Sequence, residues 1–310
     1  MCGAGWLNTL DCMTESKIQF PDPAFAADSG GTPLARFATA NAVRRQRRVW
    51  SGRVASWDQH GRAGLRRVTA AVIAAADVRP GALVADLGCG NGQLSLPLAE
   101  RGAQVLAIDV SPAMVTDLAQ QAMQRGLTGL DAVALPIESL ALPEGSLDLV
   151  VSSYALHHLR DSDKARLVAA AFQWLRPGAR LVLAGMMFGR GGSSRDREII
   201  ASKVRALASK GPGGWWRIGK NAVRYQLRLQ ERPVSMAAWT SMMTASGFAD
   251  VAARPIAAEA GLIIARRPER PQPGAIRDTV RPVLGADQDD FEGSRAVYAL
   301  DPFQLNVTCR

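Results

Sequence analysis

The sequence predicts an α/β protein in which helices cover both faces of a mostly parallel sheet. From Leu83 onward, short apolar runs alternate with helix-like stretches, which is typical of strands joined by helical crossovers. A glycine-rich turn, Gly88-Cys89-Gly90-Asn91-Gly92, follows the first apolar run. The chain has 310 residues, 47% of them hydrophobic, so it is long enough to bury a sizeable core.

Hydrophobic periodicity and turn residues set the bounds of each expected element. Ser111 is a good N-cap, Pro112 suits the first position of the helix that follows, and Gly126 suits its end. Pro177-Gly178 is expected to stop a later helix. In chain order, we expect helices over 63–76, 93–101, 112–125, 161–175 and 235–245, and strands over 83–86, 104–108, 131–135, 147–152, 180–184, 251–254 and 262–265.

The glycine and proline content divides the chain into three parts. Residues 1–40 show no sustained periodicity and are expected to form a loose leader. Residues 41–266 carry the regular alternation, which is interrupted over 188–234 by a glycine-rich and basic insert. Residues 267–310 are rich in Arg, Pro, Gln and Asp, and we expect them to form a disordered tail.

Composition limits the location of the protein and its partners. The net charge is +9, which suits nucleic acid, anionic lipid or an anionic substrate, but a solvated basic surface is the preferred explanation because charge alone identifies no site. The four cysteines, Cys2, Cys12, Cys89 and Cys309, lack metal-ligand spacing. We therefore expect no metal, and free thiols in a reducing cytoplasm. The opening residues lack the basic region of a signal peptide, and no apolar run reaches the roughly 18 residues of a membrane span.

The central motif is a strand, a glycine-rich turn and a helix, written Val84-Ala85-Asp86-Leu87-Gly88-Cys89-Gly90-Asn91-Gly92. Glycines let the backbone approach a ligand closely, and the start of the next helix is expected to favour an anionic group. Asp109 ends the next strand, 21 residues after Gly88. At that spacing a carboxylate can accept both hydroxyls of a ribose, so the pattern predicts a nucleoside-containing ligand.

Three observations favour S-adenosylmethionine over a dinucleotide. The dinucleotide fingerprint needs a third glycine at the sixth position, where this chain has Gln93. Asp86, just ahead of the turn, suits a ligand with an ammonium group and would repel a pyrophosphate. The second half of the expected sheet also brings no second nucleotide-binding turn.

Residues 57–266 resemble the class I methyltransferase family, and especially its ubiquinone/menaquinone-biosynthesis-like branch. This resemblance covers about two-thirds of the chain and implies a doubly wound, Rossmann-like sheet of seven strands with S-adenosyl-L-methionine as the methyl donor. Its segments are Asp86-Leu87-Gly88-Cys89-Gly90-Asn91-Gly92, Ala107-Ile108-Asp109-Val110-Ser111-Pro112-Ala113-Met114, residues 142–150, Leu156-His157-His158-Leu159 and residues 175–183.

The resemblance also implies roles for single residues. The family usually carries an Asp-Ala pair that binds the adenine amine, whereas this chain has Pro136-Ile137, so the N–H of Ile137 or the carboxyl of Glu138 is the expected substitute. Cys89 is expected to be a small loop residue and no nucleophile. Asp86, Gly88, Cys89, Gly90 and Gly92 would hold the methionine half of the donor, Asp109 and Val110 the ribose, and Met114 the adenine, with Ser152 beside the donor at the active-site mouth.

Candidates for a catalytic base are fewer and rest on residue type alone. His157, Tyr154 and His60 could each move a proton, because histidine titrates near neutral pH. A packing role is the preferred interpretation, because proton removal depends first on geometry. The expected reaction is an in-line displacement onto an O, C or N atom of a small molecule. A protein methyltransferase and a non-catalytic relative that only binds S-adenosylmethionine stay open.

The insert over residues 188–234 has a strongly skewed charge. Three acidic residues, Asp196, Glu198 and Glu231, accompany a much larger basic set. With Trp215 and Trp216, this segment could cover an acidic or aromatic substrate, contact an anionic membrane, or be a solvated helical insert. No base-flipping loop or RNA-binding module is visible, so we expect no specific nucleic-acid binding. The basic residues are Arg190, Arg195, Arg197, Lys203, Arg205, Lys210, Arg217, Lys220, Arg224, Arg228 and Arg232.

Overall fold

The computed structural model describes residues 62–189, 191–209, 211, 213, 215, 232–257 and 259–269, together with residues 44, 47 and 48. The chain separates into two units, Met1–Ile276 and Arg277–Arg310, and the second lies wholly outside the described residues. The expected leader over 1–40 and most of the expected tail also lie outside them, as do His60, Cys2, Cys12 and Cys309.

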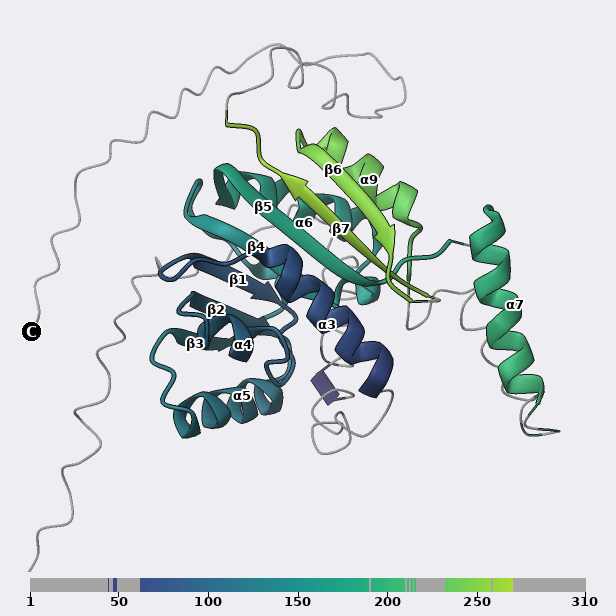
Figure 1. The fold of residues 1–310 in the computed structure, drawn as a ribbon, viewed down its shortest axis with the longest axis horizontal. Helices are drawn as coiled ribbons and strands as arrows, with labels where there is room; N and C mark the ends of the chain where they lie inside the picture. Colours follow the sequence, from purple (N-terminus) through teal and green to yellow (C-terminus); the bar gives the residue numbers. More distant parts are fainter. Residues whose placement is uncertain are drawn as a thin grey trace, which may run out of the picture. The chain divides into compact units, whose positions relative to one another are not determined.

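A seven-stranded sheet forms the centre of the first unit, in the order β3-β2-β1-β4-β5-β7-β6 (Figure 1). The first five strands pair in parallel, whereas β7 runs antiparallel to both β5 and β6. The prediction of a mostly parallel, seven-stranded sheet is confirmed. Its strands are β1 (Leu83–Leu87), β2 (Gln104–Asp109), β3 (Leu130–Ala134), β4 (Leu147–Ser153), β5 (Leu175–Met186), β6 (Ala249–Pro255) and β7 (Ala260–Arg266).

Helices cover both faces of this sheet, as predicted. One buried cluster joins residues of α3, α4 and α5 to one face, and a second cluster joins residues of α6 and α9 to the other. Helix α7 extends away from the sheet (Figure 1). The helices are α3 (Arg62–Ala76), α4 (Ser95–Ala99), α5 (Pro112–Gln124), α6 (Asp161–Trp174), α7 (Ser194–Ala208) and α9 (Met236–Ala245), with short 3-10 helices η1 (Ile137–Ser139) and η2 (Leu156–His158).

Strand alternation decides which side chains of β1 reach which face. Val84 belongs to the cluster under α3, α4 and α5, whereas Ala85 and Leu87 belong to the cluster under α6 and α9. Successive side chains of a strand point to opposite faces, so Asp86 lies on the α4 side. Its carboxylate Oδ2 there accepts a 2.6 Å hydrogen bond from the hydroxyl of Ser95.

The predicted start and end of α5 are confirmed. The side chain of Ser111 accepts a hydrogen bond of 3.4 Å from the backbone N–H of Met114, and Pro112 is the first helical residue. Gly126, with φ +66°, follows the last turn. A glycine adopts this left-handed conformation without the steric penalty that a Cβ atom would bring.

Two expected element bounds are wrong. The expected helix over 93–101 is regular only over the five residues of α4, because residues 91–94 form the turn that closes the glycine loop. So short a helix provides no helix-dipole site for an anion. The Pro177-Gly178 pair does not stop a helix either. Helix α6 ends at Trp174, and Pro177 and Gly178 lie inside the irregular start of β5, where Gly178 has φ +81°.

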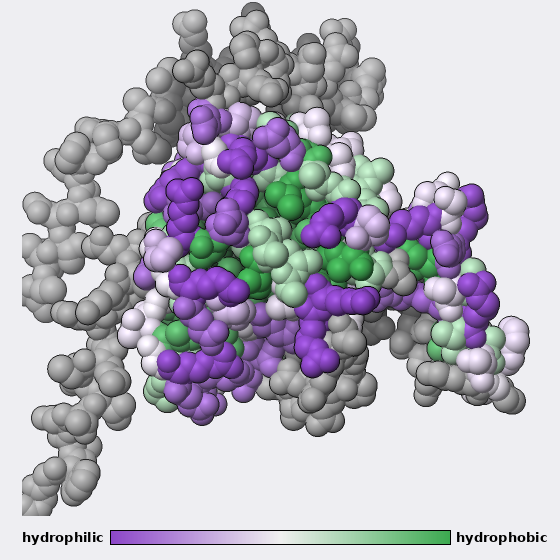
Figure 2. All heavy atoms as spheres, viewed as in Figure 1, coloured by the Kyte–Doolittle hydropathy of each residue, from purple (hydrophilic) through white to green (hydrophobic). Residues whose placement is uncertain are grey.

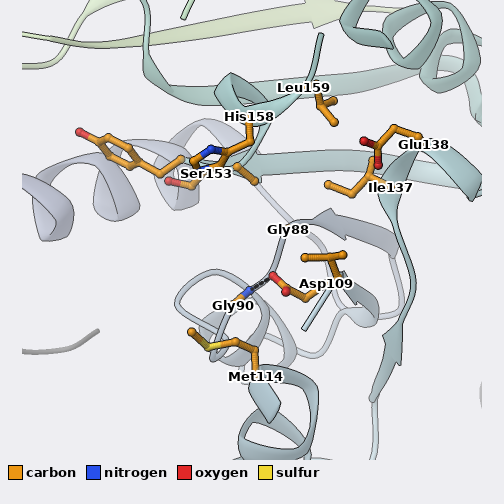
Figure 3. A pocket seen from close by; sticks show the side chains of 12 residues that line it. Gly88, Gly90, Asp109, Met114, Ile137, Glu138, Ser153, His158 and Leu159 are labelled. Carbon is orange, nitrogen blue, oxygen red and sulfur yellow. Dashed lines mark hydrogen bonds between the residues drawn. The ribbon is translucent and has the colours of Figure 1, made fainter. Parts of the chain in front are cut away.

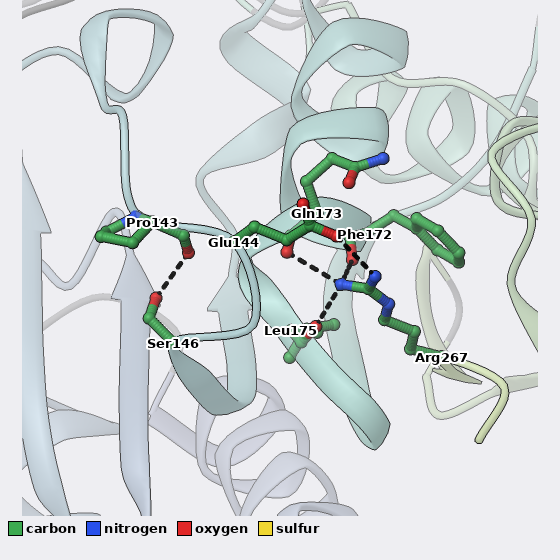
Figure 4. Close-up of polar contacts among 7 residues, drawn as sticks. All are labelled: Pro143, Glu144, Ser146, Phe172, Gln173, Leu175 and Arg267. Atoms are coloured by element: carbon green, nitrogen blue, oxygen red, sulfur yellow. Dashed lines mark hydrogen bonds and ion pairs between the residues drawn. The ribbon is translucent and has the colours of Figure 1, made fainter. Parts of the chain in front are cut away.

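The ordered chain extends past residue 266, where the tail was expected to begin. The side chain of Arg267 donates hydrogen bonds to the carbonyls of Phe172, Gln173 and Leu175 at 3.1, 2.9 and 2.6 Å (Figure 4). It also forms an ion pair of 2.9 Å with Glu144. Carbonyls at a helix C-terminus have no partner within the helix, so Arg267 caps α6 from a distant part of the chain.

Helix α7 belongs to the basic insert and begins with a capping box. Ser193 accepts a hydrogen bond from the backbone N–H of Asp196, whose carboxylate accepts one in return from the N–H of Ser193. Two basic side chains of α7 bind their own domain: Arg195 donates to the carbonyls of Ala257 and Ala260, and Lys203 pairs with Glu259. Part of the basic charge is therefore used inside the domain.

Hydrophilic side chains cover much of the face seen in Figure 2, including much of α7, and smaller hydrophobic areas lie between them. Among the residues that the structure describes, no helix combines the length and apolar character needed to cross a bilayer.

Candidate functional site

A cleft lies at the carboxyl ends of β1, β2 and β4, where parallel α/β sheets bind their ligands (Figure 3). One wall of the cleft consists of the glycine loop after β1 and the segment after β2. The segment after β4 forms another wall. The lining residues are Gly88, Gly90, Asp109, Val110, Met114, Ile137, Glu138, Ser153, Tyr154, Ala155, His158 and Leu159.

The glycine loop is held tightly against β2. The backbone N–H groups of Gly88 and Cys89 both donate to the carbonyl of Ile108, at 2.7 and 3.0 Å. Gly88 has φ +78°, and a Cβ atom there would lie 2.1 Å from the Cβ of Ala155. Only glycine allows the loop to pass this close to the segment after β4, so the predicted need for glycine has a specific cause at this position.

Asp109 is fixed by the backbone at both of its carboxylate oxygens. Oδ2 accepts a 3.0 Å hydrogen bond from the N–H of Gly90 (Figure 3), and Oδ1 accepts one of 2.8 Å from the N–H of Ser111. Burial raises the pKa of this carboxyl, and the two backbone hydrogen bonds oppose that rise. Each oxygen keeps a further lone pair, so a rigid double acceptor lies in the cleft wall.

Asp86 lies beneath the loop and outside the cleft lining, with 1% of its surface exposed. Burial raises its pKa to about 7, the hydrogen bond from Ser95 lowers it, and the charge of Asp109 raises it further. Within the described residues, Oδ1 of Asp86 is buried and has no hydrogen-bond partner. A buried polar atom without a partner is rare in proteins and marks a place where a ligand or water can bind.

Cys89 and Gly92 of the glycine loop, both predicted to hold the donor, also lie outside the cleft lining. Cys89 is a buried, free cysteine whose pKa is raised by burial, so it is a packing residue as expected. Gly92 is buried, with φ +94°, and a Cβ atom there would lie 2.3 Å from a methyl carbon of Leu118. Gly92 therefore permits close packing of the loop on α5.

The far end of the cleft is apolar on two opposite sides. Met114 lies on one side, and Ile137 lies on the other beside Glu138 (Figure 3). Met114 is fixed as the third residue of α5, and the 3-10 helix η1 positions Ile137 and Glu138. We refer to the part of the cleft between Met114 and Ile137 as the apolar slot, and Glu138 lies beside Ile137 there.

Sequence reasoning was wrong by one residue at the end of β4. Ser153 lines the cleft, whereas Ser152 is 1% exposed and donates a 2.6 Å hydrogen bond to the carbonyl of Leu87. The pairing of β1 with β4 ends at Asp86 and Val151, and the Ser152 hydroxyl binds the next carbonyl of β1. Strand alternation could have found Ser153, because adjacent residues point to opposite sides.

Tyr154, a candidate base from the sequence, lines the cleft and has a strained backbone. Its φ is +53°, which is uncommon for a bulky residue, and its N–H donates to the carbonyl of Ala184 at 3.0 Å. Burial, and then the charge of Glu259, raise the pKa of its phenol to about 12. At neutral pH the Tyr154 side chain is a hydrogen-bond donor and a poor base.

The two histidines after β4 separate into different environments. His158 lines the cleft, whereas His157 is buried and lines a second, smaller pocket with Leu156, Met187 and Trp239 among its neighbours. Burial keeps the pKa of His157 well below its ordinary value, so its ring is neutral. The prediction singled out His157 and missed His158, which is the one that faces the cleft.

Residues 84–178 match the family described as methyltransferase domain. An aklanonic acid methyltransferase of a Streptomyces species is 33% identical over 114 residues, covering 36% of this chain and 51% of that protein. A ubiquinone biosynthesis O-methyltransferase of Xanthomonas euvesicatoria is 36% identical over 105 residues, covering 34% and 43%. The chain thus spans about half the length of the curated relatives it matches.

Solved structures show the same fold. A 1,6-didemethyltoxoflavin-N1-methyltransferase of Burkholderia thailandensis, with S-adenosylhomocysteine bound, superimposes with a TM-score of 0.53 and 19% identity, over 78% of this chain and 93% of that chain. At this identity the likeness concerns the fold alone, and it agrees with the sheet order described above. The resemblance predicted from the sequence motifs is confirmed.

Proposed function

We propose that this chain is a class I, S-adenosylmethionine-dependent methyltransferase that transfers a methyl group to a small-molecule acceptor by in-line displacement. The match of residues 84–178 to a methyltransferase domain and the methyltransferases that the chain resembles support this proposal. The observation that carries this proposal is the double acceptor of Asp109, opposite an apolar slot, at the carboxyl ends of β1 and β2. S-adenosylmethionine, when bound, supplies a methyl group made electrophilic by a positively charged sulfur.

The residues of the cleft fit each part of that donor. The lone pairs of Asp109 suit two ribose hydroxyls, and Val110 follows it along the wall. The slot between Met114 and Ile137 suits a purine ring, and Glu138 lies where its carboxyl can accept from an exocyclic amine. We infer this assignment from position and chemistry.

The methionine half fits the glycine loop. Gly90 has no atom within 4 Å of the place where a Cβ would lie, so a ligand can approach its backbone closely. Below the loop, the unpartnered Oδ1 of Asp86 supplies the negative charge that an ammonium group prefers. Asp86 acts from beneath the loop, through its charge or through a water, because it does not line the cleft.

On the acceptor side of the cleft, the chain's own residues would orient the acceptor and exclude water. Ser153, Tyr154 and His158 bring two hydroxyl groups and an imidazole to the segment after β4. Alignment of a nucleophile contributes most to such a displacement, and a dry cleft favours the dispersal of charge. If the acceptor needs to lose a proton, His158 is the group best placed to take it, ahead of the buried His157.

A small-molecule acceptor is favoured by the relatives. Their printed names give aklanonic acid, a ubiquinone precursor pathway and 1,6-didemethyltoxoflavin, all associated with small compounds. The atom that receives the methyl group differs among them, so we propose the acceptor class and no single atom. The described basic residues Arg197 and Arg205 of α7 stay exposed, and contact with an acidic substrate or membrane through them is a secondary part of the proposal.

Calorimetric titration with S-adenosylhomocysteine, with NADH run alongside, tests the proposal. We expect saturable binding of S-adenosylhomocysteine alone. Binding of NADH alone would return the glycine loop to a dehydrogenase. Binding of S-adenosylhomocysteine without methyl turnover across a broad panel of small acceptors and a protein extract would favour a non-catalytic binding protein, and turnover only with the protein extract would favour a protein methyltransferase.

A further inference from the structure

Lys164 is a lysine with no exposed surface, near the start of α6. Its ammonium donates hydrogen bonds to the carbonyls of Leu159 and Arg232, at 2.8 and 2.7 Å, and to the carboxylate of Asp161 at 3.1 Å. Lysine is among the residues least often buried completely. Two of these partners are main-chain carbonyls, and the residues that carry them lie 73 positions apart in the chain.

The ion pair with Asp161 does not account for this burial. The side chain of Asp161 is 43% exposed, so solvent weakens its attraction for the ammonium. The fourth position of a helix is also unfavourable for a cation, because the helix dipole places partial positive charge there. An apolar side chain of similar volume usually fills such a site at lower cost. The ammonium also joins two main-chain carbonyls from distant segments.

Those carbonyls belong to the wall of the cleft and to the return of the basic insert. Leu159 follows η2 and lines the cleft, and Arg232 is the first described residue after residues 216–231. The N–H of Arg232 donates to the carbonyl of His157 at 2.7 Å. The main chain of Arg232 is thus bound on one side to η2 and on the other to Lys164.

The η2 segment separates the two pockets. Ala155 lines both, His158 and Leu159 line the cleft, and His157 lines the second pocket. A small rotation of this short 3-10 helix would move a side chain in each pocket. Few contacts within η2 itself prevent such a rotation, since its three residues form little more than one turn.

We propose that Lys164 is a positioning residue: its ammonium locks η2 against Arg232 and thereby fixes the cleft wall formed by His158 and Leu159. The insert and the donor cleft are then linked through one buried side chain. This inference rests on the proposed function only in that the cleft binds the methyl donor.

The test replaces the ammonium and compares two readouts. In Lys164→Met the aliphatic volume is kept and both carbonyls lose their donor. We expect the Kd for S-adenosylhomocysteine to rise about tenfold, and amide hydrogen exchange to accelerate in residues 155–160 and 232–235 while β1 and α3 stay protected. The matched control is Arg166→Met, which removes an exposed cation of the same helix, paired with Asp163, and should leave both readouts unchanged.

The outcomes separate positioning from folding. If Lys164→Met does not fold, Lys164→Gln carries the test, because its amide can still donate to a carbonyl and should give an intermediate Kd. Wild-type affinity in a folded variant, or faster exchange spread over the whole domain, would overturn the proposal. If the unmodified protein binds no S-adenosylhomocysteine, the proposed function fails, and local exchange at η2 still decides the role of Lys164.

Discussion

The cleft wall built by β1 and β2 differs from the wall built by β4 and η2 in the sequence distance of its contacts. Asp109 binds Gly90, 19 positions away, and Ser111, 2 positions away. In the other wall, Ser152 binds Leu87 across 65 positions, and Lys164 binds Arg232 across 68. The first wall is therefore held by contacts between residues close in sequence, whereas the second wall depends on contacts between segments far apart in sequence.

This difference has a chemical counterpart. The first wall offers backbone N–H groups and carboxylates, which suit a ligand of fixed structure such as a nucleoside. The second offers hydroxyls, an imidazole and apolar side chains near an anchored insert, which suit a ligand that varies between relatives. Under the proposed function, a methyl donor and a methyl acceptor would place different demands on one cleft, and the two walls would meet these demands separately.

The largest effect on stability is expected at the contact between the two walls. Gly88→Ala puts a methyl group 2.1 Å from the Cβ of Ala155 and strains a backbone with φ +78°. We expect the free energy of unfolding to fall by about 3 kcal/mol, measured by urea denaturation. Gly90→Ala is the matched control, because its Cβ meets no atom within 4 Å, and backbone strain alone should cost about 1 kcal/mol. Equal losses would show that the walls do not touch tightly here.

The local wall should carry most of the donor affinity. Asp109→Ala removes both oxygens that accept from Gly90 and Ser111 and would accept from a ribose. We expect the Kd for S-adenosylhomocysteine to rise about 50-fold with cooperative unfolding retained, since charged hydrogen bonds are strong. Glu100→Ala removes an exposed acid paired with Arg125 and serves as the control. Near-wild-type affinity in Asp109→Ala would remove the ribose assignment.

The pKa of Asp86 predicts a pH dependence of stability. Burial raises its pKa to about 7, so between the ordinary value of 3.8 and 7 the folded protein binds more protons than the unfolded chain. Stability from this group is therefore highest at low pH and falls as pH rises. We expect the unliganded protein to lose about 2 kcal/mol between pH 5 and pH 7 relative to Asp86→Asn, by urea denaturation at each pH. Parallel pH curves for the two proteins would contradict this prediction.

A change far from both walls should separate stability from binding. Arg267→Ala uncaps the end of α6, and its lost hydrogen bonds should cost about 1 kcal/mol of unfolding free energy. Its partner Glu144 is 67% exposed, so that ion pair adds little. The Kd for S-adenosylhomocysteine should stay unchanged. An altered Kd would mean that the carboxyl and amino ends of the strands are coupled, and the two-wall description would then be incomplete.

The same division explains what could be predicted from the sequence. The alternation of strands and helices and the Ser111 cap follow from residues within short windows, and the structure confirms both. Asp109 was also chosen from a short window, and it lines the cleft. Ser152 and His157 were chosen one residue away from the side chains that line the cleft, because residue type does not reveal orientation. The roles of Lys164 and Arg267 could not be predicted from the sequence, because each donates hydrogen bonds to carbonyls that are far away in the chain.

The place of β7 in the sheet has a consequence for synthesis. Strand β7 pairs with β5 on one side and β6 on the other, although it is the last strand in the part of the chain that the structure describes. A nascent chain on the ribosome therefore exposes β5 as an open edge until Arg266 has emerged, and β6 can add nothing before then. Open edges recruit other strands, so an interrupted translation product of this protein would be a substrate for chaperones and proteases.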